Sequence, residues 1–128
     1  MIKIAHESPK SIFDDVQKVT DYDYALVHLL EEDEQYLKHF EKAIKKGREV
    51  ILDNSIFELE EAFEADKFAY WVEKIRPEWY IVPDALEDMQ KTIDQMEEWN
   101  KTYRTLPGKK IGVVQGKTPE EIMECYAY

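Results

Sequence analysis

The sequence has a single cysteine, four glycines and no long apolar segment among its 128 residues. The lone Cys125 cannot form a disulfide within the chain, which excludes the small disulfide-rich class and favours a reducing compartment. No apolar run approaches the roughly 20 residues of a membrane-spanning helix. The N-terminus also lacks a signal-peptide pattern. We therefore expect a cytoplasmic protein.

Positive charge is also scarce, because 17 lysines and arginines stand against 28 aspartates and glutamates, for a net charge of −11. Such a surface repels phosphate groups, which argues against non-specific binding to nucleic acid or to anionic membranes. The chain has no Walker A motif, no G-x-G-x-x-G and no C-x-x-C. Nucleotide-hydrolase, dinucleotide-cofactor and zinc-knuckle functions therefore lack a motif, and we expect no cofactor and no bound metal.

What the chain does contain is an apolar content of 44% and five alternations of a short apolar run with a helical pattern, as expected for one globular domain over residues 1–128. The predicted strands are residues 2–5, 24–30, 50–52, 79–82 and 111–114. Helices are expected from Ser11, from the acidic run 31–34 to Gly47, over residues 59–75, after Asp84, and from the capping residue Thr118. The stripe predicted to be buried on the third of these is Ala65, Phe68, Val72 and Ile75.

This alternation predicts an α/β fold with parallel strands and right-handed crossovers. We expect a partial TIM-type (βα)₈ barrel of about five βα units, the N-terminal part of a longer barrel. The alternative is a five-stranded doubly wound open sheet.

Polar residues stand at the end of every predicted strand. Because the carboxyl ends of parallel strands lie on one rim, the sequence predicts that these side chains form a site. Each position alone also has a structural explanation as a helix cap or turn residue. The candidates are His6, His28, Asp53 with Asn54 and Ser55, Asp84, and Gln115 with Gly116.

Three segments carry a resemblance to a known family: V-I-L-D-N-S-I-F-E at residues 50–58, I-V-P-D-A at 81–85 and G-V-V-Q-G at 112–116. Together they resemble the tRNA-guanine transglycosylase superfamily, and the L-D-N-x-x-F-E and P-D forms are closest to its phage and bacterial branch. That branch inserts 7-deazaguanines, bases of the queuosine type, into DNA. The resemblance implies a (βα)₈ barrel and a glycosyltransferase that exchanges guanine for a 7-deazaguanine through a covalent enzyme–nucleic acid intermediate.

The resemblance also implies roles for individual residues. Asp53 would be the catalytic aspartate that acts in proton transfer beside the reacting base. Asp84 would bind the N–H edge of the base, and Gln115 with the Gly116 backbone would hold its carbonyl side. Asn54 and Ser55 are further substrate-binding candidates, because they follow Asp53 directly. A flat heterocycle with both donors and acceptors needs such a set.

The family's nucleophilic aspartate lies on a later strand than any in this sequence. We therefore expect the base-recognition part of such an enzyme, inactive alone, with DNA a more favoured substrate than tRNA. Expected partners are guanine or a 7-deazaguanine, nucleic acid in the complete enzyme, and either further copies of the chain or a second polypeptide that completes the barrel.

Two other functions stay open. A metal-dependent barrel hydrolase or lyase would use strand-end histidines and aspartates as ligands, namely His6, His28, Asp53 and Asp84. A binding module without catalytic activity would keep the pocket and lack the chemistry.

Overall fold

Five parallel strands form one sheet in the computed structural model, which describes residues 2–128. The strands are β1 (Ala5–His6), β2 (Tyr22–Leu26), β3 (Glu49–Asp53), β4 (Trp79–Ile81) and β5 (Lys109–Ile111). They pair in chain order, β1-β2-β3-β4-β5, and every pair is parallel. The predicted α/β class and the open five-stranded parallel sheet are therefore confirmed.

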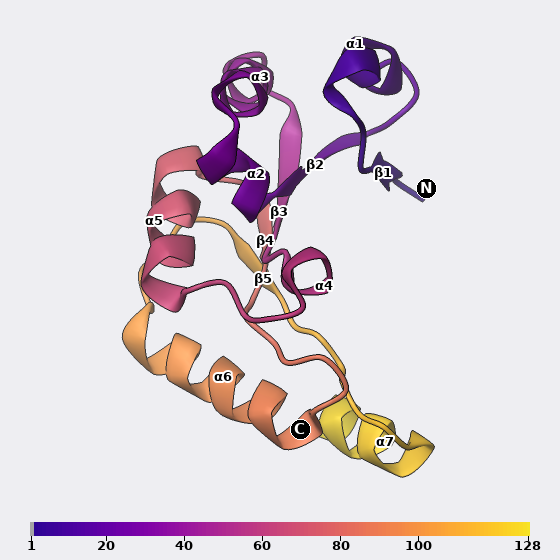
Figure 1. Ribbon diagram of the computed structural model, residues 1–128, viewed down its shortest axis with the longest axis vertical. Coiled ribbons are helices and arrows are strands. Elements are labelled where there is room, and N and C mark those ends of the chain that lie inside the picture. The colour runs from indigo at the N-terminus through magenta and orange to yellow at the C-terminus, as the bar shows by residue number, and fades with distance from the viewer. Residues whose placement is uncertain (1) are drawn as a thin grey trace.

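The helices connect successive strands. They are the 3₁₀ turn η1 (Lys10–Ile12), α1 (Phe13–Val16), α2 (Val27–Glu32), α3 (Glu34–Lys45), α4 (Ile56–Leu59), α5 (Ala65–Ile75), α6 (Met89–Thr102) and α7 (Pro119–Ala127). In Figure 1, α1, α3, α5 and α6 form an arc around one side of the sheet, and the short α4 lies on the opposite side. The strand order has no reversal, so each crossover moves the chain one strand further along the sheet.

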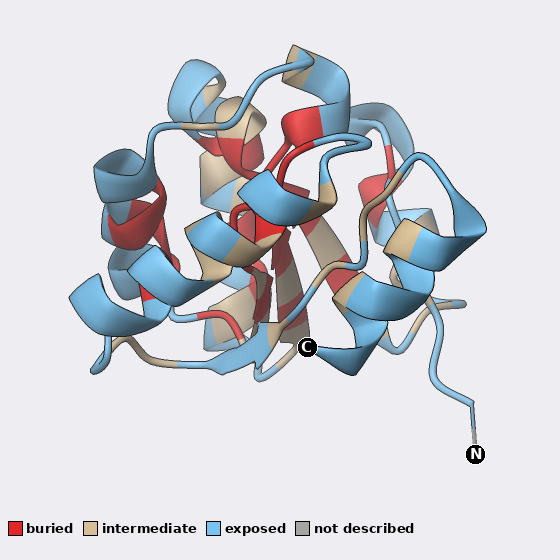
Figure 2. Cartoon of the chain, turned by 90° about the horizontal axis from the view of Figure 1, so that it is seen from below, coloured by how far each residue is buried: buried red, intermediate tan, exposed pale blue. Residues whose placement is uncertain are grey.

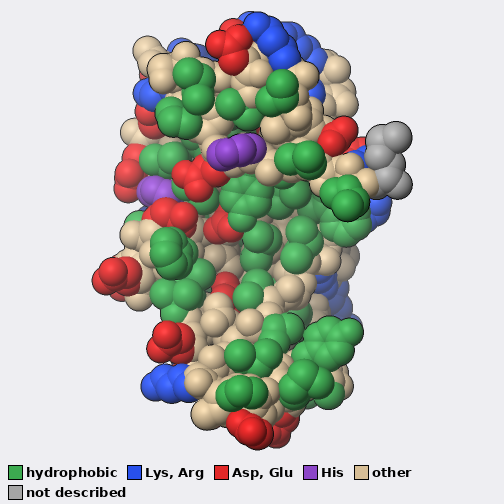
Figure 3. Space-filling view, turned by 90° about the vertical axis from the view of Figure 1, so that its right-hand side faces the viewer, with side chains coloured by type: hydrophobic (Ala, Val, Ile, Leu, Met, Phe, Trp, Pro, Cys, Tyr) green, Lys and Arg blue, Asp and Glu red, His purple; other side chains and the backbone are tan. Residues whose placement is uncertain are grey.

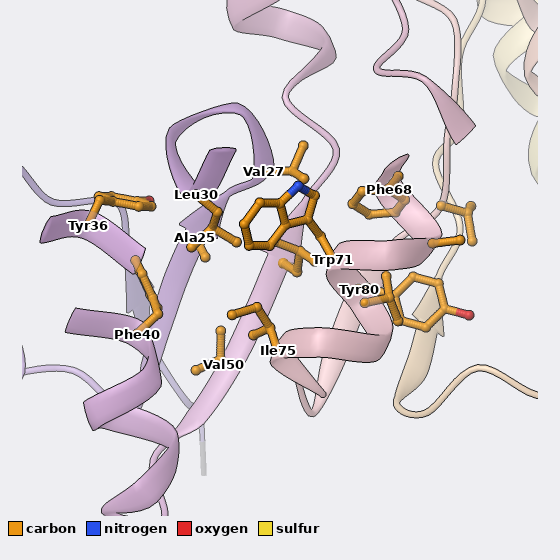
Figure 4. Close-up of a cluster of buried hydrophobic side chains, with 14 of the residues drawn as sticks. Ala25, Val27, Leu30, Tyr36, Phe40, Val50, Phe68, Trp71, Ile75 and Tyr80 are labelled. Atoms are coloured by element: carbon orange, nitrogen blue, oxygen red, sulfur yellow. The ribbon is translucent and has the colours of Figure 1, made fainter. Parts of the chain in front are cut away.

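The core lies between the sheet and this arc of helices. Alternate strand residues point toward the helices and are buried: Ala25 on β2, Val50 and Leu52 on β3, and Tyr80 on β4. Figure 4 shows α3 and α5 side chains packed against them, and Figure 2 shows buried colour on the sheet and the inner sides of the helices. The helices contribute Phe13 from α1, Val27 and Leu30 from α2, Tyr36 and Phe40 from α3, Phe68, Ala69, Trp71, Val72 and Ile75 from α5, and Trp99 from α6.

The remaining strand residues, which alternate with the buried ones, point to the opposite face of the sheet. Tyr24, Ile51, Trp79 and Lys109 form one row across four strands through the register of the sheet. The three aromatic or apolar members are only half-buried, and Figure 3, which looks at this side, shows hydrophobic side chains gathered along it. We call this surface, defined by Tyr22, Tyr24, Ile51, Trp79, Ile81 and Ile111, the open face.

A buried ion pair ties β2 to the start of β3. Asp23, 2% exposed, accepts hydrogen bonds from Arg48 Nη2 at 2.9 Å and from Gln17 Nε2 at 2.7 Å. Arg48 also donates to the backbone and hydroxyl oxygens of Thr20. Because both ions are paired and hydrogen-bonded, the desolvation of the carboxylate is offset.

Several predicted helix ends are confirmed. Thr118 caps α7 by accepting the Glu121 amide at 3.2 Å. Asp33 caps α3 by accepting from the amides of Gln35 and Tyr36, so the second half of the acidic run begins a helix, whereas Glu31 and Glu32 end α2. Gly47 follows α3 with φ +81, a conformation that favours glycine.

Other predicted boundaries are wrong. Residues 27–30 form α2 instead of extending the second strand, so His28 lies on a helix. Val27 and Leu30 are buried there, and an apolar run of that length suits a buried helix as well as a strand. Ser11 lies inside η1 and caps nothing, because α1 begins at Phe13.

The predicted helix over residues 59–75 is broken. Only its first residue, Leu59, belongs to α4. Glu60 follows α4 in a left-handed conformation (φ 58), and α5 begins only at Ala65. Phe68, Val72 and Ile75 are buried as predicted, but Ala65 is exposed. The first strand is displaced to residues 5–6 and the last to 109–111, because short edge strands carry little apolar signal.

Candidate functional site

The carboxyl ends of β3, β4 and β5 are joined by a chain of side-chain hydrogen bonds. Asn54 follows β3, Asp84 follows β4 and Gln115 follows β5. Both amides donate to the same carboxylate: Asn54 Nδ2 lies 2.7 Å from Asp84 Oδ1, and Gln115 Nε2 lies 2.7 Å from Asp84 Oδ2. Three of the strand ends singled out in the sequence therefore meet at one place.

Asn54 is buried and fully hydrogen-bonded. Besides Asp84, its amide nitrogen donates to the carbonyl oxygen of Val82 at 2.8 Å, and its Oδ1 accepts the Ile56 amide at 3.0 Å. The side chain is 3% exposed. Asn54 thus joins the end of β3 to the end of β4 and holds one oxygen of Asp84 in place.

Asp84 is a carboxylate 2% exposed, in the loop between β4 and α6. Its Oδ1 is held from the inside by Asn54, and its Oδ2 faces the partly exposed Gln115. A carboxylate held in this way is an acceptor with one oxygen committed to the fold and one directed toward the rim.

Gln115 uses both ends of its amide. Its Oε1 accepts the backbone N–H of Glu87 at 3.1 Å, while its Nε2 donates to Asp84. Glu87 has φ 55, a left-handed conformation that is uncommon outside glycine and costs on the order of 1–3 kcal/mol. The loop after β4 is thus bent so that the backbone N–H of Glu87 and Oδ2 of Asp84 both bond to the side-chain amide of Gln115.

Asp53 lies at the end of β3 and points toward the open face. Its Oδ2 accepts a hydrogen bond from the hydroxyl of Tyr24, and its Oδ1 accepts the Ser55 amide at 2.6 Å. Burial, and then the hydrogen bond to Asp53, raise the pKa of Tyr24 far above its usual value, so this phenol stays protonated and acts as a donor. Asp53 is half-buried at the end of β3.

Ser55 and Gly116 have structural contacts. Ser55 is fully buried, adopts φ 61, and its hydroxyl accepts the His28 amide at 3.3 Å. A Cβ on Gly116 would lie 2.8 Å from Cβ of Glu121 and 2.9 Å from the backbone nitrogen of Ile122. Glycine at 116 therefore lets the loop after β5 approach the first turn of α7.

The two candidate histidines, His6 and His28, are not part of this hydrogen-bonded set. His6 is exposed on β1, and His28 lies on α2 with a buried Nδ1 that has no hydrogen-bond partner among residues 2–128. Across that same range, no three His, Cys, Asp or Glu side chains are arranged to hold a metal ion. The ligand set of the metal-dependent alternative, with His6, His28, Asp53 and Asp84, is therefore not assembled there.

Sequence reasoning missed two members of the site, Tyr24 and Glu87. Tyr24 lies opposite Ile51 of β3, two residues before Asp53, and alternate residues share a face, but the sequence does not show this register. Glu87 contributes its backbone N–H, and no side-chain pattern in the sequence marks such a group. His39 on α3 is half-buried and stacks on Phe13 with ring centroids 3.5 Å apart.

Compared with models of protein families, with curated protein sequences and with solved structures, the chain has no significant match. Among residues 2–128, no helix is both long enough and apolar enough to cross a lipid bilayer.

Proposed function

We propose that this chain is the base-recognition part of a transglycosylase that exchanges guanine for a 7-deazaguanine in nucleic acid, with DNA the favoured substrate. The observation that carries the proposal is the buried Asp84 carboxylate, held at Oδ1 by Asn54 and directed at the rim through Oδ2. In this role Asp84 accepts the N–H edge of the base. The resemblance of residues 50–58, 81–85 and 112–116 to the transglycosylase superfamily supplies the reaction.

The chemistry of the remaining residues supports these roles. Departure of guanine from C1′ leaves negative charge on the base, and a nearby proton donor or shared hydrogen bond lowers the barrier. Asp53 is half-buried, is held by Tyr24 and Ser55, and lies one residue before Asn54, the partner of Asp84. We assign Asp53 the proton transfer, Gln115 and Gly116 the third side of the pocket, and Asn54 and Ser55 the positioning of these groups.

We further propose that the sheet is part of a (βα)₈ barrel. In support, the strands follow chain order without reversal, the connecting helices lie in an arc on one side, and the open face presents Tyr24, Ile51 and Trp79. In a closed barrel those side chains fill the interior. The remainder of the barrel would then cover them and carry the nucleophile.

The net charge of −11 indicates which part of the proposed enzyme binds the phosphates of the nucleic acid. Nucleic-acid binding depends on neutralising phosphates with lysine and arginine. In the proposed enzyme, the base pocket therefore belongs to this chain, and the phosphate-binding surface belongs to the part that completes the barrel.

The experiment that tests the proposal is isothermal titration of the purified chain with guanine and with the 7-deazaguanines preQ0 and preQ1. The expected result is saturable binding that is lost in Asp84→Asn. This variant keeps the size of the side chain but replaces the carboxylate by an amide, which cannot accept through both oxygens.

The matched control is Asp15→Asn, because Asp15 is a surface residue paired with Lys18 and 75% of its side chain is exposed. Asp15→Asn should bind as the wild type does, and thermal unfolding should show that both variants are folded. If the folded wild-type chain binds none of the three bases, the base-recognition function is excluded.

A further inference from the structure

The amide of Gln115 makes the two hydrogen bonds that a cyclic amide would make in the same place. Its nitrogen donates to Asp84 Oδ2 at 2.7 Å, and its oxygen accepts the Glu87 backbone N–H at 3.1 Å. Donor and acceptor sit on the two ends of one planar N–C=O unit. The lactam edge of guanine and of 7-deazaguanines has the same pattern, an N–H beside a C=O.

We propose that Gln115 acts as an internal plug: it occupies the ligand's hydrogen-bonding positions in the empty site, and a lactam base binds by displacing it. The N–H of the lactam then donates to Asp84 Oδ2, and its carbonyl accepts the N–H of Glu87. This inference rests on the proposed function, because it takes Asp84 as the carboxylate that recognises the base. It adds the Glu87 backbone as the donor to the carbonyl, and it replaces the contact with the base that the resemblance implies for the Gln115 side chain.

The surroundings of the three groups favour this exchange. Asp84 is fixed from the inside by Asn54, so its Oδ2 keeps its position when Gln115 leaves. Gln115 is only half-buried, and its bond to Glu87 lies at the surface, so the side chain can turn outward without unpacking the core.

The strained backbone at Glu87 fits the same role. A left-handed conformation at a glutamate is costly, and such strain persists where the surrounding structure imposes it. Here it turns the amide N–H of Glu87 toward the position that the Gln115 oxygen occupies.

The pattern also defines which bases are accepted. A base that binds here needs a hydrogen-bond donor opposite Oδ2 of Asp84 and an acceptor opposite the backbone N–H of Glu87. Adenine presents a ring-nitrogen acceptor and an exocyclic amino group in those positions, so both contacts become unfavourable. 1-Methylguanine lacks the ring N–H and leaves the Asp84 oxygen without a partner.

The test is titration of 7-deazaguanine into the wild type, Gln115→Ala and Gln115→Met, with Gln35→Ala as the control. Gln35 is an exposed glutamine on α3, away from the ends of β3, β4 and β5. If Gln115 is a plug, its removal spares the cost of breaking its two hydrogen bonds, and both variants should bind about threefold to tenfold more tightly than the wild type. Gln115→Met retains the length of the side chain and shows whether packing alone matters.

Nuclear magnetic resonance of the ¹⁵N-labelled wild-type chain gives a reading that needs no variant. Binding should move the side-chain NH₂ resonances of Gln115 to the values of a free amide and shift the backbone amide of Glu87. Adenine and 1-methylguanine should leave both unchanged.

Weaker or unchanged binding by the folded Gln115 variants, beside a wild type that binds, overturns the plug and leaves the base-recognition function standing. Gln115 resonances that stay bonded in the saturated complex overturn it as well. An absence of binding by the folded wild type overturns the proposed function, and the plug with it.

Discussion

The amide nitrogen of Asn54 lies 2.7 Å from Oδ1 of Asp84 and 2.8 Å from the carbonyl oxygen of Val82. One buried side chain therefore joins the ends of β3 and β4 and fixes the orientation of the carboxylate in the candidate site. Stability and site geometry depend here on the same group.

The Asn54→Ala variant should lose about 2–4 kcal/mol of unfolding free energy, because each buried group left without a partner costs about 1–3 kcal/mol. The groups affected are the Asp84 carboxylate, the Val82 carbonyl and the Ile56 N–H. Urea denaturation measures the loss. Asn100→Ala is the control, because Asn100 is an exposed asparagine bonded to Lys110, and it should change stability by less than about 0.5 kcal/mol. Equal losses in the two variants would contradict the prediction.

Arg48→Met should be among the most destabilising single changes, at about 3 kcal/mol or more, because it leaves a buried carboxylate without its cation. Asp23, 2% exposed, is that carboxylate. Lys18→Met breaks the exposed pair with Asp15 and should cost less than about 1 kcal/mol. In urea unfolding, the double variant Asp23→Asn with Arg48→Met should recover part of the loss. A strictly additive double variant would show that the two groups do not interact.

Gly108 and Gly47 make a matched pair of substitutions. Both have positive φ, +92 and +81, but a Cβ at 108 would lie 2.6 Å from the carbonyl oxygen of Pro77, whereas a Cβ at 47 meets no atom within 4 Å. Gly47→Ala should cost about 1 kcal/mol, from backbone strain alone. Gly108→Ala should cost at least about 1 kcal/mol more, because the clash adds to the strain. Thermal or urea unfolding that ranks them in the reverse order would refute this.

The unfolding free energy of the chain should decrease as the pH is lowered, because His39 becomes protonated. Burial lowers its pKa in the folded state, against the opposing fields of Asp14 and Asp23. The unfolded state therefore binds the proton more readily, and this contribution to stability, present above the unfolded-state pKa of about 6.5, is lost as the pH falls below it. His39→Gln should show a smaller fall in unfolding free energy than the wild type between about pH 7.5 and about pH 5.5. Parallel curves for the two proteins would show that His39 does not contribute.

The open face should drive association. Ile51 lies between Tyr24 on β2 and Trp79 on β4, in the row that faces away from the helices. Analytical ultracentrifugation of the wild type should show a concentration-dependent dimer or larger species, and Ile51→Glu should shift it toward monomer, because burying an unpaired charge is costly. Val19→Glu, at a position 77% exposed and outside the open face, is the control. A wild type that stays monomeric at all concentrations would contradict the prediction and weaken the barrel proposal.

The sequence predicted correctly those helix ends that depend on residues a few positions apart. Thr118 with Glu121 marked the start of α7, and Gly47 marked the end of α3, because capping depends on residues a few positions apart. Residues 27–30 were assigned wrongly, because a short apolar run is compatible with a buried strand and with a buried helix.

The sequence by itself determined the alternation of strands and helices, and with it a parallel sheet whose carboxyl ends carry Asp53, Asp84 and Gln115. Only the tertiary structure decided which of these groups meet. It placed Asn54 and Gln115 on the two oxygens of one carboxylate, left His6 and His28 outside that set, and brought in Tyr24 and the backbone of Glu87. The physical reason is that hydrogen bonds between strand ends depend on register, on loop conformation and on burial, which involve residues about 30 positions apart in the chain.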